Sequence, residues 1–210
     1  LYTGQSNGLM GRPRKELMQH IYKGENFALV LKRARLLGKE KIFNHCFVSD
    51  LMIDKNFLAD QSYCFPLYLY PETSEQQTTD SEQLTRTPNL NPEILSKIEE
   101  SLQLNFVPEK EVGGNVCMAN SEEVRDDFKI SFAPIDLLDY IYAVLHSPEY
   151  REKYKEFLKI DFPRVPYPQD SENFWQLVKL GGELRQLHLL ESSIVEKYIT
   201  GYPEYGDNII

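Results

Sequence analysis

The chain has 210 residues, of which 41% are hydrophobic and 12% aromatic, and its formal net charge is −9. This composition is typical of a packed globular protein with one sizeable domain or two small ones. No apolar run is long enough to span a membrane and no signal-peptide pattern is present, so we expect a cytoplasmic protein without a membrane partner. The three cysteines are scattered without a CxxC motif, which favours reduced thiols and no metal site.

The charge is unevenly distributed along the chain. Residues 1–45 contain nine Lys or Arg and three acidic residues, a net charge of +6, which leaves −15 for residues 46–210. A protein with one basic region and an acidic remainder can bind a phosphate backbone locally. The alternative is an ordinary solvated basic surface.

The first half of the chain predicts a mixture of helix and strand. Residues 13–22 have the spacing of a short helix, and residues 26–31 form an apolar run typical of a buried strand. Residues 42–48 alternate in character, which predicts a strand with Asn44 on the same side as Cys46.

A further strand is predicted over residues 63–70, where an internal proline indicates a sheet edge or a bulge. Residues 72–90 are polar and without a period, so we expect a mobile loop. Residues 91–104 then form a helix capped by Asn91, which we interpret as an insertion within the domain.

The second half predicts helices. Residues 136–146 are apolar nearly all round, apart from a polar strip that includes Asp136 and Asp139, which is typical of a helix buried in a bundle. Ser147 is placed to cap a second, amphipathic helix, which must end before the prolines that follow residue 162.

A third helix is predicted over residues 171–191, and it contains Gly181 and Gly182. Each glycine costs about 1 kcal/mol relative to alanine in a helix. Such a pair indicates either a close approach by another element or a break into two shorter helices. We favour the close approach.

Together these elements predict an α+β fold. We expect a mixed α/β part with a small twisted sheet over residues 1–134 and a helical bundle over residues 135–210. We also expect the helical part to continue beyond the end of the sequence, which closes on two isoleucines.

Four stretches stand out as motifs: GRPR at residues 11–14, FPLYLYP at 65–71, DLLDYIYAVLHSPEYREKYKEFLKIDFPRVP at 136–166 and GGELRQLHLLES at 181–192. In this order they resemble the C-terminal specificity domain of single-polypeptide, type ISP, restriction–modification enzymes. These large bacterial proteins join a nuclease, a helicase-like motor, an adenine-N6 methyltransferase and a target-recognition domain.

The resemblance implies a module that recognises a double-stranded DNA sequence and positions the target adenine for the rest of the enzyme. The expected partners are double-stranded DNA and the methyltransferase domain of the same parent chain. We expect no cofactor and no catalysis by this chain. Its sequence contains no GxxxxGK[ST] phosphate loop, no GxGxxG turn and no Asn-Pro-Pro-aromatic motif of the kind that grips a flipped adenine.

The basic cluster that follows the first predicted strand is our first candidate for sequence reading. Arg33 and Arg35 would share one side if the strand continues, and we expect them to contact bases or the nearby backbone, with Lys32 opposite them on phosphate. Asn44 and His45, on the next strand, are the second candidates for base contacts.

A second group of expected DNA contacts lies near the start of the sequence. Arg12 and Arg14 flank a proline that stiffens the backbone, and we expect both, with Lys15, to contact phosphate. An alternative function remains open, namely a non-catalytic interdomain scaffold or protein-interaction domain that binds no nucleic acid.

Overall fold

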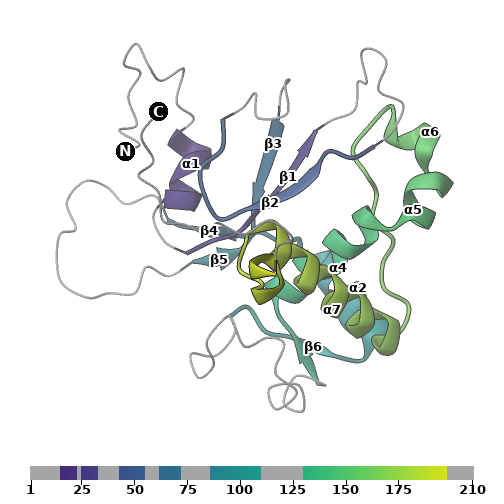
Figure 1. The fold of residues 1–210 in the computed structure, drawn as a ribbon. Coiled ribbons are helices and arrows are strands. Elements are labelled where there is room, and N and C mark those ends of the chain that lie inside the picture. Colours follow the sequence, from purple (N-terminus) through teal and green to yellow (C-terminus); the bar gives the residue numbers. More distant parts are fainter. Residues whose placement is uncertain are drawn as a thin grey trace, which may run out of the picture.

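The computed structural model describes residues 15–22, 25–32, 43–54, 62–71, 86–109 and 130–197. Figure 1 shows small sheets packed against a group of helices, and this is the predicted α+β fold. The helices and strands are, in chain order, α1 (Lys15–Tyr22), β1 (Ala28–Lys32), β2 (Cys46–Ser49), β3 (Ser62–Pro66), β4 (Tyr68–Leu69), β5 (Thr87–Pro88), α2 (Pro92–Leu102), β6 (Asn105–Phe106), β7 (Ser131–Phe132), α4 (Pro134–His146), α5 (Pro148–Lys153), α6 (Lys155–Leu158), α7 (Ser171–His188) and the short 3₁₀ helix η2 (Ser193–Glu196).

The largest sheet is antiparallel, with strand order β2-β1-β3. The prediction of a buried strand in the apolar run is confirmed by the central strand β1, where Ala28 and Val30 are almost fully buried. Pro66 ends the edge strand β3, where its missing backbone donor breaks no ladder. The sheet therefore has two edges, β2 and β3, on either side of a buried centre.

The predicted strand over residues 63–70 is divided between two sheets. β3 ends at Pro66, and β4 pairs instead with β5, so that Tyr68 lies opposite Pro88. The prediction of a mobile loop over residues 72–90 is therefore wrong at Thr87 and Pro88, while residues 72–85 lie outside the described part of the chain. Composition did not predict β5 because this strand is held by backbone pairing with β4. The backbone of Asn89 extends the pairing by donating to the Leu67 carbonyl at 2.8 Å.

The buried side chain of Asn26 joins α1 to the sheet. Its amide nitrogen donates to the carbonyls of His20, at 2.7 Å, and Tyr68, at 2.8 Å, while its oxygen accepts from the Tyr68 backbone at 3.1 Å. The His20 ring accepts from the backbone of Tyr70 at 2.9 Å. These contacts fix α1 beside β4, and they give His20 a structural role.

Helix α4 is buried along most of its length, as its apolar sequence predicts. Its two acidic residues are buried as well, and both have partners. Asp136 accepts from the Ala133 backbone at 2.8 Å and so caps its own helix, whereas Asp139 pairs with Arg185 on α7. The polar strip predicted on this helix is thus, at these two positions, a satisfied part of the core.

Helix α7 is continuous through its two glycines, so the favoured alternative of close packing is confirmed. A Cβ built on Gly181 would lie 1.9 Å from the carbonyl oxygen of Asp139 on α4, closer than two such atoms can approach. The helix ends at His188, three residues before the predicted end. Only a residue without a side chain allows α4 and α7 to cross at this point.

The second helix of the prediction is two short helices, α5 and α6. Ser147 caps the first and accepts from the Tyr150 backbone at 3.3 Å, as predicted. The helix breaks at Tyr154, whose backbone leaves the helical region. The break separates two buried anchors, Tyr150 and Leu158.

One hydrophobic cluster joins the sheet to the helices, with Val48 of β2, Tyr142 of α4 and Phe174 of α7 among its members. Core residues on both sides of residue 134 thus pack together. The proposed boundary at that residue and the C-terminal bundle both remain predictions. No helix within the described ranges is long and apolar enough to cross a membrane.

Candidate nucleic-acid interface

Three of the residues predicted to contact DNA meet at one end of the main sheet, which we call the sheet end and define as Lys32, Asn44 and His45. Lys32 is the last residue of β1, opposite Ser62 of β3, and its backbone donates to the His45 carbonyl at 3.4 Å. Asn44 is exposed, and Lys32 and His45 are half-buried. The antiparallel pairing of β1 and β2 therefore brings Lys32 next to His45, thirteen positions later in the chain.

The strand predicted over residues 42–48 is shorter than expected, because β2 begins only at Cys46. Asn44 does not share a face with Cys46, and this part of the prediction is wrong. Phe43 turns into the core, with 6% of its surface exposed, and Asn44 points to solvent. Among the described residues the Asn44 amide has no hydrogen-bond partner, so it can bond to an external group.

The other predicted contact residues are not placed. Arg12, Arg14, Arg33 and Arg35 lie outside the described residues, and so does the side chain of Lys15, although its backbone begins α1. Their roles remain predictions.

A cation that sequence reasoning missed lies next to the sheet end. The Nε of Arg151 on α5 donates to the carbonyl of Leu145 at 2.7 Å, and its guanidinium lies 5.9 Å from the centre of the Phe43 ring. Figure 1 shows α5 on the side of the molecule where β2 begins. The sequence assigns Arg151 to the polar face of an amphipathic helix, and no local signal distinguishes it from its charged neighbours.

The rings of Tyr142, His146 and His188 form a cluster between α4 and α7. The Tyr142 hydroxyl lies 2.5 Å from Nδ1 of His188, and Nδ1 of His146 donates to the Tyr142 carbonyl at 2.8 Å. Burial lowers the pKa of both histidines, so each favours its neutral form. These histidines join α4 to α7 and act as structural groups.

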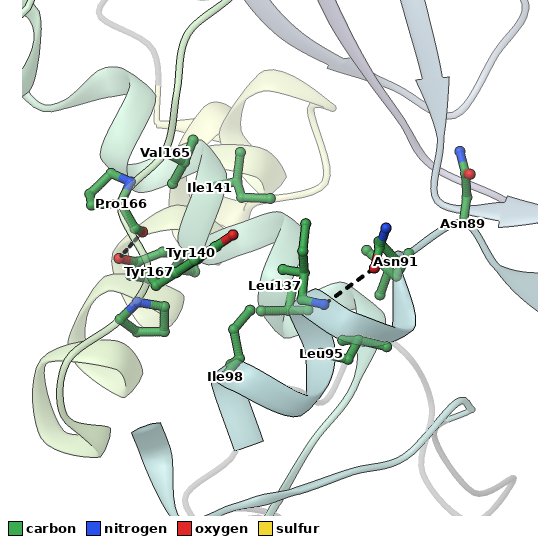
Figure 2. Close-up of a pocket in the computed structure, with 13 residues that line it drawn as sticks. Asn89, Asn91, Leu95, Ile98, Leu137, Tyr140, Ile141, Val165, Pro166 and Tyr167 are labelled. Carbon is green, nitrogen blue, oxygen red and sulfur yellow. Dashed lines mark hydrogen bonds between the residues drawn. The ribbon is translucent and has the colours of Figure 1, made fainter. Parts of the chain in front are cut away.

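A groove of about 230 Å³ lies elsewhere on the molecule, between α2, α4 and the extended segment before α7 (Figure 2). Two of its polar side chains are already used: the Tyr140 hydroxyl donates to the Pro166 carbonyl at 3.0 Å, and Asn91 caps α2. The groove can therefore accept an apolar group. The lining residues are Asn89, Leu90, Asn91, Ile94, Leu95, Ile98, Leu137, Tyr140, Ile141, Val165, Pro166, Tyr167 and Pro168.

Groups suited to catalysis are scarce in the described part of the chain. No three His, Cys, Asp or Glu side chains there are grouped so that they could hold a metal ion. Cys46 and Cys64 are free, and burial raises their pKa to about 12 and about 11, so both are thiols rather than nucleophilic thiolates at neutral pH. The geometry of the sheet end suits binding.

The type ISP C-terminal specificity domain model matches residues 1–210. Among solved structures, the ATP-dependent type ISP restriction–modification enzyme LlaBIII bound to DNA is 23% identical, with a TM-score of 0.50 over 79% of this chain. A DrdV–DNA complex is 24% identical over 81% of the chain, with a TM-score of 0.49. The matches span 8% of the LlaBIII chain and 13% of the DrdV chain. At 23% identity the likeness to LlaBIII shows the fold alone. No curated protein matches the sequence.

Proposed function

The chain belongs to the type ISP C-terminal specificity domain family, and we propose that it reads a double-stranded DNA sequence for a restriction–modification enzyme. The family match over the whole chain is the observation that carries this proposal. DNA target recognition is the function of a specificity domain, and the exposed amide of Asn44 at the sheet end, which has no partner in the described part of the chain, supplies a group suited to it.

We infer a division of labour among the contacts. Phosphate contacts fix the register of a protein on DNA, whereas contacts to base edges select the sequence. Lys32 suits phosphate, and an asparagine amide such as that of Asn44 can donate to N7 and accept from N6 of adenine. Arg33 and Arg35 follow Lys32 directly in the chain, and a guanidinium can donate two hydrogen bonds to guanine.

The proposed partner within the parent protein is the methyltransferase domain. Recognition is useful only if it places the target adenine in the methyltransferase site, so the two domains must be held in a fixed relation. The apolar groove with Ile94 and Tyr167 at its exposed rim can accommodate such a contact. The same proposal places the protein in the cytoplasm, where bacterial DNA is found.

The chain is a recognition module, and we propose that it has no methyltransferase, ATPase or nuclease activity of its own. The absence of the corresponding motifs from the sequence supports this. Purified chain assayed with S-adenosylmethionine, ATP and Mg²⁺ on duplex DNA should show no turnover above buffer. Reproducible methylation of DNA by this chain would contradict the proposal.

The groove also favours the second candidate, an interdomain scaffold without a nucleic-acid role. Salt dependence separates the two functions, because each neutralised phosphate contributes about −0.9 to the slope of log K against log salt. Four to six contacts, an order-of-magnitude estimate, give a slope of roughly −4 to −5. The measurement is anisotropy of a labelled mixed-sequence duplex with the full-length protein. A slope near zero, or no binding at about 20 mM salt, would favour the scaffold.

A further inference from the structure

We propose that Arg151 is a further DNA-contacting residue and binds a backbone phosphate beside the sheet end. This inference rests on the proposed function and extends it to a residue that neither the sequence motifs nor the family match assigns. It requires that the guanidinium lie near the sheet end, that it lack a counter-ion within the protein, and that its direction be fixed.

The position follows from a chain of contacts. The guanidinium of Arg151 lies 5.9 Å from the Phe43 ring, and Asn44 follows Phe43 directly. The next residue, His45, accepts from the backbone of Lys32. The guanidinium therefore lies beside the segment of residues 43–45, which is bonded to the end of β1, although it comes from α5, more than a hundred residues later in the sequence.

Among the described residues, Arg151 lacks the carboxylate partner that two other arginines have. Arg86 pairs with Glu109 at 2.8 Å and Arg185 pairs with Asp139 at 2.7 Å, and these partners raise the pKa of each arginine against the opposing effect of burial. No described carboxylate lies within ion-pair distance of Arg151, and burial lowers its pKa.

A half-buried cation without a counter-ion is costly, because burial removes water that the protein does not replace. An external anion would offset that cost. In a DNA-binding protein the phosphate backbone is the anion at hand, and its oxygens match the planar guanidinium.

The direction of the side chain is fixed by its other contacts. The Nε donates to the Leu145 carbonyl near the end of α4, and the central carbon of the guanidinium lies over the Phe43 ring, 5.9 Å from its centre. The two terminal Nη groups have no partner among the described residues. A guanidinium that is held in this way loses little conformational freedom when it binds phosphate.

The competing interpretation is that Arg151 only caps α4 and covers Phe43. Both interpretations expect Arg151→Gln to lower stability, so stability cannot separate them. The salt dependence of DNA binding can, because it counts phosphate contacts. The matched control is Lys97→Gln, which removes one exposed positive charge from a different helix, α2.

The experiment compares full-length protein, Arg151→Gln, Arg151→Lys and Lys97→Gln by anisotropy with a labelled mixed-sequence duplex. Salt is varied between about 20 and about 200 mM. We expect the slope for Arg151→Gln to be shallower by about 0.9, and the slopes for Arg151→Lys and Lys97→Gln to match the unchanged protein. Arg151→Lys keeps the charge, so it provides the test if the glutamine variant does not fold: a slope shallower by about 0.9 in that variant overturns the inference.

The failure of this inference differs from the failure of the proposed function. If the unchanged protein binds DNA with a steep slope and Arg151→Gln keeps that slope, Arg151 is a structural residue only and the inference is overturned. If the unchanged protein shows no salt-dependent binding, the proposed function fails, and this inference fails with it.

Discussion

Asp139 and Arg185 form a buried ion pair that joins α4 to α7. The arginine donates from Nε and Nη2 to the two carboxylate oxygens, at 2.7 and 3.1 Å, and both residues are 4% exposed. The guanidinium also lies 4.9 Å from the Phe27 ring, which precedes β1. The pair thus links the two main helices next to the residue that precedes the central strand of the sheet.

Removing one partner of this pair should be strongly destabilising. Arg185→Leu leaves the Asp139 carboxylate buried without a counter-ion, which costs about 3–5 kcal/mol. We expect a loss of that size in the free energy of unfolding, measured by urea denaturation. The control is Lys155→Ala, which breaks an exposed pair with Glu152 and should leave the urea midpoint unchanged within error.

A double variant tests whether charge imbalance is the cause. Asp139→Leu combined with Arg185→Met removes both charges, and it should be more stable than Arg185→Leu alone. If the double variant is as unstable as the single one, the loss comes from packing, and the electrostatic account is wrong.

Gly181→Ala should destabilise the protein, although helix propensity alone predicts a gain of about 1 kcal/mol. The added Cβ would lie 1.9 Å from the Asp139 carbonyl oxygen, so α4 and α7 would have to separate. We expect a loss of about 3 kcal/mol or more in the free energy of unfolding, or failure to fold. Gly182→Ala is the matched control.

The two glycines differ in what a new side chain would meet. At Gly182 the nearest atom is the side-chain Oδ2 of Asp139, at 3.0 Å, rather than backbone. A side chain can shift by a few tenths of an ångström, so Gly182→Ala should cost less than Gly181→Ala. Equal losses at the two positions would show that the close crossing at Gly181 is not the constraint.

Stability should fall as pH falls below about 6.5, because burial lowers the pKa of His146 and His188 from the usual 6.5. A lowered pKa means that the unfolded chain binds more protons in this range, so stability is fully present above pH 6.5 and is lost as pH falls through the folded-state values. The charge of Arg151 also lowers the pKa of His146, in the same direction. Exposed carboxyl groups such as Glu149, whose pKa lies below its usual value of 4.5, bind protons only at lower pH.

The measurement is the urea midpoint at about pH 7.5 and about pH 5.5, on either side of the ordinary histidine pKa. His146→Gln should reduce the difference between the two midpoints. If that variant keeps the full difference, other groups cause the pH dependence.

Local signals in the sequence predicted local structure well. The caps at Asn91 and Ser147 and the buried strand β1 are all confirmed, because each depends on residues close together in the chain. The glycine pair also predicted the close packing of α7. A helix tolerates two such costly residues most easily where another element approaches too closely for a side chain.

The parts that sequence missed depend on distant partners. β5 exists because β4 pairs with it, and Asp139 is buried because a residue forty-six positions later neutralises it. Arg151 looked like one of several charges on a helix face, and only the fold places it beside Phe43. Within the candidate interface, the pairing of β1 with β2 was needed to bring Lys32 next to His45.

The last prediction concerns which residues select the DNA sequence. Arg33→Ala or Arg35→Ala, made in the full-length enzyme, should relax or abolish recognition at one position of the target. A bidentate contact between guanidinium and guanine contributes about 1–3 kcal/mol of discrimination. Lys32→Ala should instead weaken binding to all sequences alike and flatten the salt slope by about 0.9, because a phosphate contact carries no sequence information.

The readout for this comparison is the methylated motif, mapped across genomic DNA for each variant, together with the affinity for a mixed-sequence duplex. Arg12→Ala is the control for a phosphate contact elsewhere in the basic region and should leave the motif unchanged. If the Arg33 and Arg35 variants lose affinity uniformly while the motif is unchanged, these residues hold phosphate. The reading face would then centre on Asn44, whose exposed amide has no partner among the described residues. Asn44→Ala should in that case relax recognition of an adenine, since an asparagine amide pairs with the N6 and N7 edge of that base.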